Sequence, residues 1–281
     1  MKNKIQAAIK EMESKVSRDS EHVYIEKETG IRLQGVSSVS SIVPKDWLSA
    51  WGAKECAKDL GYTDYEDYTV ATKVLESLKG MSVVDYVKRL KEAKGASTRK
   101  SNKAKLDGTA GHKWLEDNID AQLAQDDKLM PDMPIGTLLE RPLKQFCEWE
   151  AYNVEEWYAS EAFVYNPTQF YAGQLDAICL LKDGRLALCD FKFASHVSED
   201  YNLQTSGYAA CFERYGIFFD TRIIIRLPKT LEQESYDMKT HKYSMVLNNI
   251  EIYHIPTPYI DDRDAFFAAL IVKSWINKTQ K

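Results

Sequence analysis

Two apolar runs joined by a Lys-Asp-Gly turn constrain the fold of this chain more than any other feature. Residues 171–181 and 185–193 each have the length of a strand, and Lys182-Asp183-Gly184 suits a three-residue hairpin loop. Such a loop sets a register in which Asp176 lies directly opposite Asp190, with β-carbons about 5 Å apart. A two-residue loop would instead put the two aspartates on opposite faces. Because carboxylates this close repel each other, the first register predicts a cation between them.

Strand alternation places Lys192 on the same face as Asp190, and Phe191 on the other. Both faces of the hairpin are largely apolar, which is typical of a sheet covered on both sides. The face of the aspartates carries Ile178, Leu180, Leu186 and Leu188, and the other carries Leu175, Leu181 and Phe191. A salt-bridged strand end is the simpler interpretation of a lone Asp-x-Lys. The register, the Gly-x-x-Asp before it and the helix after it favour a functional site.

Composition limits the class of protein and its partners. The 281 residues are 44% hydrophobic and suit one large domain, or a core with a substantial insertion. The net charge of −5 predicts no global attraction to nucleic acid, so local patches would have to hold such a partner. The five cysteines form no Cys-x-x-Cys pair, which argues against structural zinc, an iron–sulfur cluster or a disulfide framework. We expect reduced thiols in a cytoplasmic protein, with no membrane span and no signal peptide.

The first third of the chain is predicted to be mostly helical, and we expect it to form a helical N-terminal region of residues 1–107. Apolar residues at helical spacing predict helices over residues 3–17, 46–60, 64–79 and 82–94, with a small hairpin over residues 22–42. The second expected region is a core of residues 108–281.

A concentrated basic segment spans residues 88–105 of this acidic chain. Arg99, Lys100, Lys103 and Lys105 are its candidates for contacts with nucleic-acid phosphates. A solvated helix face followed by a mobile loop is the alternative interpretation, with about even support.

The segment that follows predicts a helix from Gly108 to about residue 125, with Asp107 or Thr109 as its cap. His112 falls on its inward face, where a buried core histidine is the alternative to a metal ligand. Downstream, a strand near residues 158–165 carries Glu161, and the helix after the hairpin carries Gln204 and Tyr208 one turn apart.

These residues occur in the order His112, Glu161, Gly-x-x-Asp176, Asp190-x-Lys192 and Gln204-x-x-x-Tyr208. The order and spacing resemble the PD-(D/E)XK nuclease superfamily. Within it, they resemble the RecB-like branch, and the closer likeness is to phage-encoded exonucleases and the mitochondrial genome maintenance exonuclease. The resemblance covers about residues 108–227, with a weaker likeness in the Gly-Val-Ser-Ser-Val-Ser stretch from Gly35. The sequence lacks the cluster-forming cysteines of some RecB-like relatives.

The resemblance implies an α/β fold with a restriction-endonuclease-like core, a mixed central sheet flanked by helices in the order αβββαβ. His112, Asp176, Asp190 and the carbonyl of Phe191 would bind Mg²⁺ or Mn²⁺, which oxygen-rich ligands suit. The resemblance further implies roles for four residues. Lys192 would position and help deprotonate the attacking water, Glu161 would bind a second cation or the water, and Gln204 and Tyr208 would orient the lysine or contact DNA.

The expected function is a metal-dependent DNA exonuclease that prefers single-stranded ends, in phage DNA recombination, repair or replication. Three alternatives stay open: a catalytically silent nucleic-acid-binding protein on the same fold, a structure-specific endonuclease, and a hydrolase of another phosphate ester. The intact acidic pair with its lysine argues against a silent protein, since binding alone does not need two repelling carboxylates.

Overall fold

The computed structural model describes residues 1–21, 23–62, 68–228, 230–237 and 242–279. Its contacts form two compact units, one of Met1–Val43 with Gly108–Lys281 and one of Pro44–Asp107. The expected N-terminal region of residues 1–107 is therefore distributed over both units. Its first 43 residues pack with the core because the apolar face of their first helix is buried against the sheet.

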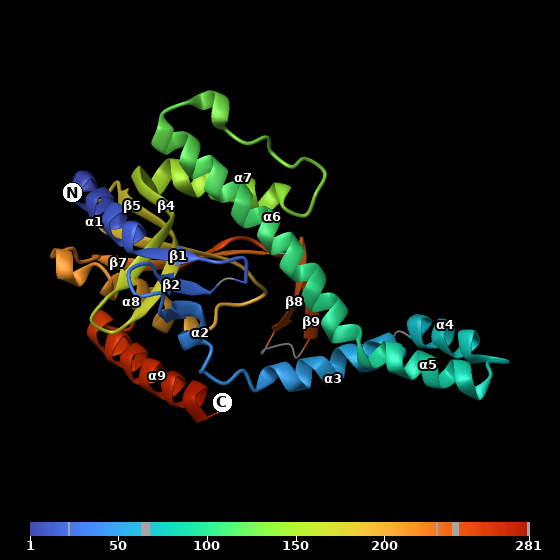
Figure 1. Cartoon of the computed structure of the whole chain (residues 1–281). Helices are drawn as coiled ribbons and strands as arrows, with labels where there is room; N and C mark the ends of the chain where they lie inside the picture. The colour runs from blue at the N-terminus through green and yellow to red at the C-terminus, as the bar shows by residue number, and fades with distance from the viewer. Residues whose placement is uncertain (22, 63–67, 229, 238–241, 280–281) are drawn as a thin grey trace. The chain divides into compact units, whose positions relative to one another are not determined.

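The first unit is built on an α/β arrangement with a mixed central sheet, as the sequence predicts (Figure 1). The strand order is β1-β2-β3-β5-β6-β7-β10, and β4 pairs with β5 in addition. The strands are β1 (Val16–Arg18), β2 (Tyr24–Glu26), β3 (Arg32–Gly35), β4 (Val154–Asn166), β5 (Tyr171–Leu181), β6 (Leu186–Phe193), β7 (Thr221–Leu227) and β10 (Glu251–His254). Strands β3 and β5 are parallel, as are β6 and β7, and the other pairs are antiparallel. Strands β8 (Glu232–Asp237) and β9 (Lys242–Leu247) form a separate hairpin.

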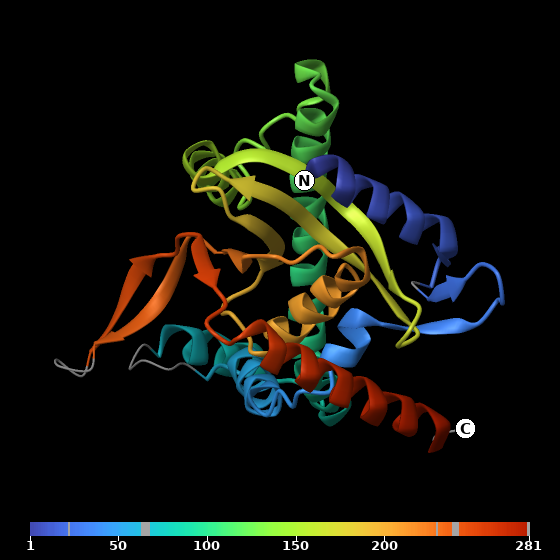
Figure 2. The same ribbon diagram turned by 90° about the vertical axis from the view of Figure 1, so that its left-hand side faces the viewer.

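The helices of this unit cover both faces of the sheet. They are α1 (Lys2–Lys15), α2 (Val36–Ser40), α7 (Glu140–Asn153), α8 (Asp200–Ala210), α9 (Tyr259–Thr279) and the second part of α6 (Ala96–Ala124), with short 3-10 turns η1 (Asp127–Leu129) and η2 (Glu213–Tyr215). Helices α1, α2, α8 and α9 enclose a first apolar cluster, and α6 and α7 enclose a second. In Figure 2, α1 runs along β4 and α9 lies beside α8.

The central hairpin has the predicted register. The N–H of Leu181 donates to the carbonyl of Arg185 at 2.9 Å, and Gly184 adopts a φ of +87°, which the three-residue loop requires of a glycine. Side chains alternate as expected, with Ile178 and Leu188 in the first cluster and Phe191 in the second. The expectation for Leu175 is wrong. It packs with the first cluster, at the end of β5 where β3 and β4 are the neighbours and the ladder with β6 has ended.

Helix α6 starts earlier than the sequence predicts. It begins at Ala96 and runs without interruption to Ala124, instead of starting near Gly108. The glycines that suggest a boundary lie inside the helix, and Gly111 is there for close packing. A β-carbon on Gly111 would lie 2.1 Å from Cζ of Phe193 in β6, so only glycine lets helix and strand approach this closely.

The second unit consists of α3 (Trp47–Asp59), α4 (Thr69–Leu78), α5 (Val83–Lys94) and the first part of α6. These bounds agree with the helices predicted over residues 46–60, 64–79 and 82–94, although residues 63–67 lie outside the described part of the chain. Arg89 forms an ion pair with Asp59 and also donates to its carbonyl oxygen, which joins α5 to α3.

Candidate metal centre

Three acidic residues lie in one row across β4, β5 and β6. Glu161 stands between two residues of β4 whose partners flank Asp176 in β5, so these two acids face each other. On the other side of β5 the last backbone pair is Ala177 with Cys189, and Asp176 and Asp190 are the next residues along the two strands. The hairpin register is thus the predicted one, with Asp176 and Asp190 as the next positions beyond the last ladder pair, and the structure adds Glu161 to the row.

Strands β5 and β6 form a fork at this row. Their ladder ends at Ala177 and Cys189, whereas β6 continues to pair with β7 as far as Phe193. The N–H of Phe191 donates to Oδ2 of Asp176 at 2.6 Å, so a carboxylate replaces the carbonyl that the ladder would have supplied. The fork therefore fixes Asp176 through the backbone of the Asp-x-Lys strand. Phe191 itself packs into the second cluster, and the metal-ligand role of its carbonyl stays a prediction.

His112 extends from α6 toward this row. One ligand atom each of His112, Glu161 and Asp176 lies within 4.8 Å of the other two. Nδ1 of His112 is 3.9 Å from Oδ2 of Asp176, and its ring lies 5.4 Å from the ring of Phe193. The histidine is thus placed by the contact between Gly111 and Phe193 that brings α6 close to β6.

Asp190 lies beside this group and is bound to Lys192. Nζ of Lys192 is 2.6 Å from Oδ2 of Asp190, which confirms that strand alternation places both on one face. Asp190 is fully buried, and its Oδ1 accepts no hydrogen bond from any residue that the structure describes. Burial raises the pKa of Asp190 to about 6, against the opposing charge of Lys192. For Lys192 burial acts to lower the pKa, but the charges of Asp190 and Asp176 prevail and the pKa is raised.

Glu161 is the most strained member of the row. It has a φ of +44° inside a strand, a left-handed conformation that costs a residue with a β-carbon on the order of 1–2 kcal/mol. Gln174 donates to its carbonyl at 3.0 Å, and Arg18 in turn donates to Gln174 at 2.5 Å. Burial, followed by the charges of Asp176 and Glu116, raises the pKa of Glu161 to about 8. The sequence suggested only a weak role for Glu161, because a backbone distortion leaves no signature in the residue type.

Gln204 and Tyr208 bind each other. Nε2 of Gln204 donates to the hydroxyl of Tyr208 at 2.9 Å, and both side chains are buried. The ring of Tyr208 packs on Gly173, where an added β-carbon would lie 2.6 Å from the ring and 2.9 Å from Val36. Close packing therefore explains the glycine of Gly-x-x-Asp, because helices α2 and α8 contact β5 three residues before Asp176.

Tyr201 is a neighbour of the site that the sequence did not suggest. Its ring centroid lies 5.0 Å from Nζ of Lys192, within the range of a cation–π contact. It precedes Gln204 by one turn of α8, so its position in the helix could have predicted that it lies near the site. A single tyrosine in a helix is too common for that signal to be specific.

The candidate nucleic-acid contacts lie in the second unit, where two of them have acidic partners. Arg99 is 3.3 Å from Asp59, and Lys100 is 3.0 Å from Glu55. Lys103 and Lys105 are exposed. These partners reduce the local positive field, which weakens the phosphate-binding interpretation.

The donor set around the fork fits a divalent cation. It combines several carboxylate oxygens with one imidazole, the ligands that Mg²⁺ and Mn²⁺ accept. Two observations support the fit: the buried Oδ1 of Asp190 accepts no hydrogen bond from the described residues, and the carboxyls of Glu161, Asp176 and Asp190 all have raised pKa values. Burial is the main cause in each case, and a cation between the carboxylates would offset its cost.

The free cysteines of the described chain form no metal-binding cluster. Sγ of Cys179 and Sγ of Cys189 are 3.7 Å apart, as two buried thiols in contact. None of the helices in the described residues combines the length and the apolar character that a bilayer crossing needs. In comparisons with known proteins, no protein-family model and no curated protein matches this chain.

Proposed function

We propose that this chain is a metal-dependent deoxyribonuclease, and that it acts as an exonuclease with a preference for single-stranded DNA ends. The observation that carries the proposal is the fork between β5 and β6, where Asp176 and Asp190 lie beside Glu161, His112 and Lys192. A protein core gains no stability from three neighbouring acids, since burial and mutual repulsion make each of them costly. A site that binds a cation and a phosphate would explain why the three acids lie together.

The order of elements supports a nuclease core. Helix α7, strands β4, β5 and β6, helix α8 and strand β7 follow one another as helix, three strands, helix, strand. That is the order of the PD-(D/E)XK superfamily that the motifs resemble. A restriction-endonuclease-like core is therefore part of the proposal.

The residues of the fork have distinct proposed roles. His112, Asp176 and Asp190 would hold Mg²⁺ or Mn²⁺, and Glu161 would be a further ligand of that cation or of a second one. When bound, the cation stabilises negative charge that develops on the scissile phosphate and activates a water molecule. Lys192 has a fixed position between Asp190 and Tyr201, from which it would orient the attacking water and help to remove its proton.

Gln204 and Tyr208 would act indirectly. Both are buried, and the ring of Tyr208 rests on Gly173 of β5. We therefore propose that they support the strand that carries Asp176, in preference to direct contact with DNA.

Two features favour attack on strand ends. No element among the described residues forms a dedicated module for reading base edges in a groove. The net charge of −5 also disfavours tight capture of internal duplex sites by charge alone. The resemblance to phage-encoded exonucleases points in the same direction.

The test compares a linear single strand, the matching duplex and a covalently closed single-stranded circle of the same sequence, end-labelled where possible, with magnesium. We expect the linear single strand to shorten fastest and the circle to survive. Equal rates on circle and linear strand would contradict the exonuclease and favour an endonuclease. Tight binding without cleavage of any DNA, with either metal, would favour the catalytically silent alternative. Cleavage confined to RNA or mononucleotides would favour another phosphate esterase.

A further inference from the structure

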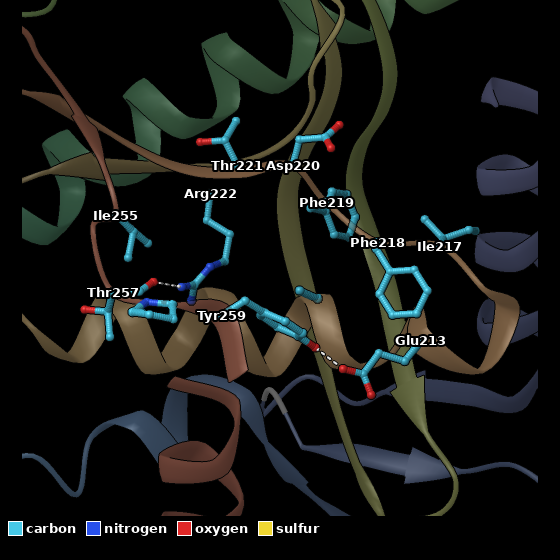
Figure 3. Close-up of a pocket in the computed structure, with 12 residues that line it drawn as sticks. Glu213, Ile217, Phe218, Phe219, Asp220, Thr221, Arg222, Ile255, Thr257 and Tyr259 are labelled. Atoms are coloured by element: carbon cyan, nitrogen blue, oxygen red, sulfur yellow. Dashed lines mark hydrogen bonds between the residues drawn. The ribbon is translucent and has the colours of Figure 1, made fainter. Parts of the chain in front are cut away.

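A cavity of about 230 Å³ opens at the start of β7, away from the metal centre (Figure 3). Its walls include Glu213, Phe218, Phe219, Arg222, Thr257 and Tyr259. The lining residue of β7 that is nearest to the metal centre, Arg222, pairs with Leu188, whereas Asp190 pairs with Ile224 two residues further along. At about 3.3 Å per residue, the nearest residues of the two sites are separated by about 7 Å along the strand.

Planar side chains are part of an otherwise mixed polar and apolar lining. Figure 3 shows the rings of Phe218 and Tyr259 and the guanidinium of Arg222 around the same space. Phe218 is 64% exposed although it belongs to a wall, so a ligand that covered it would bury apolar surface that now faces water. A single planar ring system is the shape that such walls accept.

One hydrogen-bond donor faces this cavity from a buried side chain. Arg222 is 6% exposed, and its two terminal nitrogens donate to Asn202, Thr205, Thr257 and Asp262. Its Nε–H donates to none of the residues that the structure describes. Because the guanidinium is held at its other end, this N–H has a fixed position for a ligand acceptor such as a carbonyl.

Hydrogen-bond acceptors lie across the floor. The hydroxyl of Tyr259 donates to Oε1 of Glu213 at 2.6 Å, which leaves the phenol oxygen able to accept. Oε2 of Glu213 accepts from no residue in the described ranges, since Arg263 also uses Oε1. A ligand with N–H groups would therefore find acceptors on Tyr259 and Glu213, which line the same cavity as Arg222.

The charged residues that line the cavity are two acids, Glu213 and Asp220, and one base, Arg222. Two guanidinium groups, Arg222 and Arg263, are each paired with carboxylates. Asp262 lies behind the wall as the partner of Arg222, and Arg185 interacts with Asp220 from outside the cavity. Because Arg222 is already neutralised by Asp262, a phosphate inside would face the charges of Glu213 and Asp220, so a neutral group is the better match.

We propose that this cavity binds a nucleobase of an uncharged nucleoside, with a ring carbonyl on Nε of Arg222 and a ring or exocyclic N–H on Tyr259 or Glu213. Guanine, cytosine and uracil offer both a carbonyl and an N–H donor, whereas adenine has no carbonyl. The site goes beyond the proposed nuclease activity and does not depend on it. An arginine side chain of a partner protein would also match the carboxylate of Glu213, but it would place a second guanidinium against Arg222.

The experiment uses the full chain in EDTA, as wild type and as Asp190→Asn. Guanosine, cytidine, uridine and adenosine are titrated by calorimetry and by saturation-transfer NMR. We expect the first three to bind with a Kd below about 1 mM and adenosine to bind at least about fivefold more weakly. Phe218→Ser removes an exposed wall and should weaken binding about tenfold or more, without a change in melting temperature. Tyr259→Phe should weaken it less. The control Tyr152→Ser, at a tyrosine that is 82% exposed elsewhere, should change nothing.

Several outcomes would overturn the proposal. These are the absence of saturable binding of any nucleoside at several times the expected Kd, adenosine binding as tightly as the others, and a Phe218→Ser variant that binds normally. Tighter binding of N-acetylarginine amide than of any nucleoside would assign the cavity to a cationic side chain instead. Because all titrations are free of metal, a failed nuclease assay leaves these results unaffected.

Discussion

The sheet of the first unit and the helices of residues 44–107 differ in which side chains they bury: the sheet buries charged groups, and the helices leave apolar groups exposed. In the sheet, Asp190 is completely buried and Lys192 is held against it. In the helical unit, no residue of α3 or α4 is buried, and large apolar side chains remain exposed. Exposed examples are Trp47, Leu75, Val83, Val84 and Leu106. Costly buried charge marks the place where chemistry is expected, whereas helices with little buried surface are more easily changed without loss of the fold.

The strongest way to break this comparison is to remove the buried charges. Asp190→Asn or Lys192→Ala should lower metal-dependent DNA cleavage by about a thousandfold or more, because cation, water and lysine act as one unit. Rates on a labelled single strand with magnesium measure the effect, and circular dichroism checks the fold. Lys10→Ala, at an exposed lysine of α1, is the matched control. Folded variants that cleave at nearly the normal rate would contradict the assignment.

A pair of helical glycines tests packing in the two regions. Gly111→Ala forces a β-carbon onto Phe193 and should lower the free energy of unfolding by about 2–3 kcal/mol. Gly52→Ala in α3 meets only Ser97, at 3.8 Å, and should be neutral or stabilise by up to about 1 kcal/mol. Thermal and urea unfolding measure both. If the two substitutions had equal effects, the close approach of α6 to β6 would be in doubt.

The raised pKa of Glu161 predicts a pH dependence of stability in the metal-free protein. Its folded pKa of about 8 lies above the usual value for glutamate, so the folded state binds more protons than the unfolded state between those values. Stability should therefore fall as pH rises from about 4.5 to 8. Glu161→Gln should remove that loss and stabilise the protein at pH 8 by on the order of 1–2 kcal/mol, after allowance for coupling and screening.

Melting temperatures in EDTA at pH 5 and pH 8 give the comparison. Glu155→Gln, at an exposed glutamate of the same strand, is the control and should leave the pH profile unchanged. A wild type and a Glu161→Gln variant with parallel profiles would show that the carboxyl titrates normally.

The smallest effect is expected from the helical unit. Replacing Arg99, Lys100 and Lys103 with glutamine should reduce the salt dependence of DNA binding by about one unit of slope per lost phosphate contact. Because Arg99 and Lys100 already have acidic partners, we expect a total well below three units. Fluorescence anisotropy at several salt concentrations, with the Asp190→Asn background and no metal, measures the slope. An unchanged slope would return these residues to a solvated helix face.

The sequence predicts those structural features that are set by residues close together in the chain. The hairpin register follows from Lys182-Asp183-Gly184 because a three-residue loop leaves one way to pair the strands, and Asp190 and Lys192 then share a face by alternation. The predicted start of α6 was wrong because glycine usually ends helices. A glycine is needed at position 111 because of the contact with Phe193, in a strand that is distant in sequence. The left-handed φ of Glu161 and the acidic partners of Arg99 and Lys100 likewise depend on contacts remote in sequence.

The pairing of β3 with β5 has a consequence for the time course of folding. These strands are parallel and meet through Gln34 with Tyr171 and Gly35 with Ala172, while α1 packs against β4. The first 43 residues therefore find their partners only after most of the chain has been synthesised, with the helical unit emerging in between. Contacts of such long sequence separation form slowly. We infer that a nascent chain displays the amphipathic face of α1, with Ile5, Ile9 and Met12, until β4 and β5 leave the ribosome.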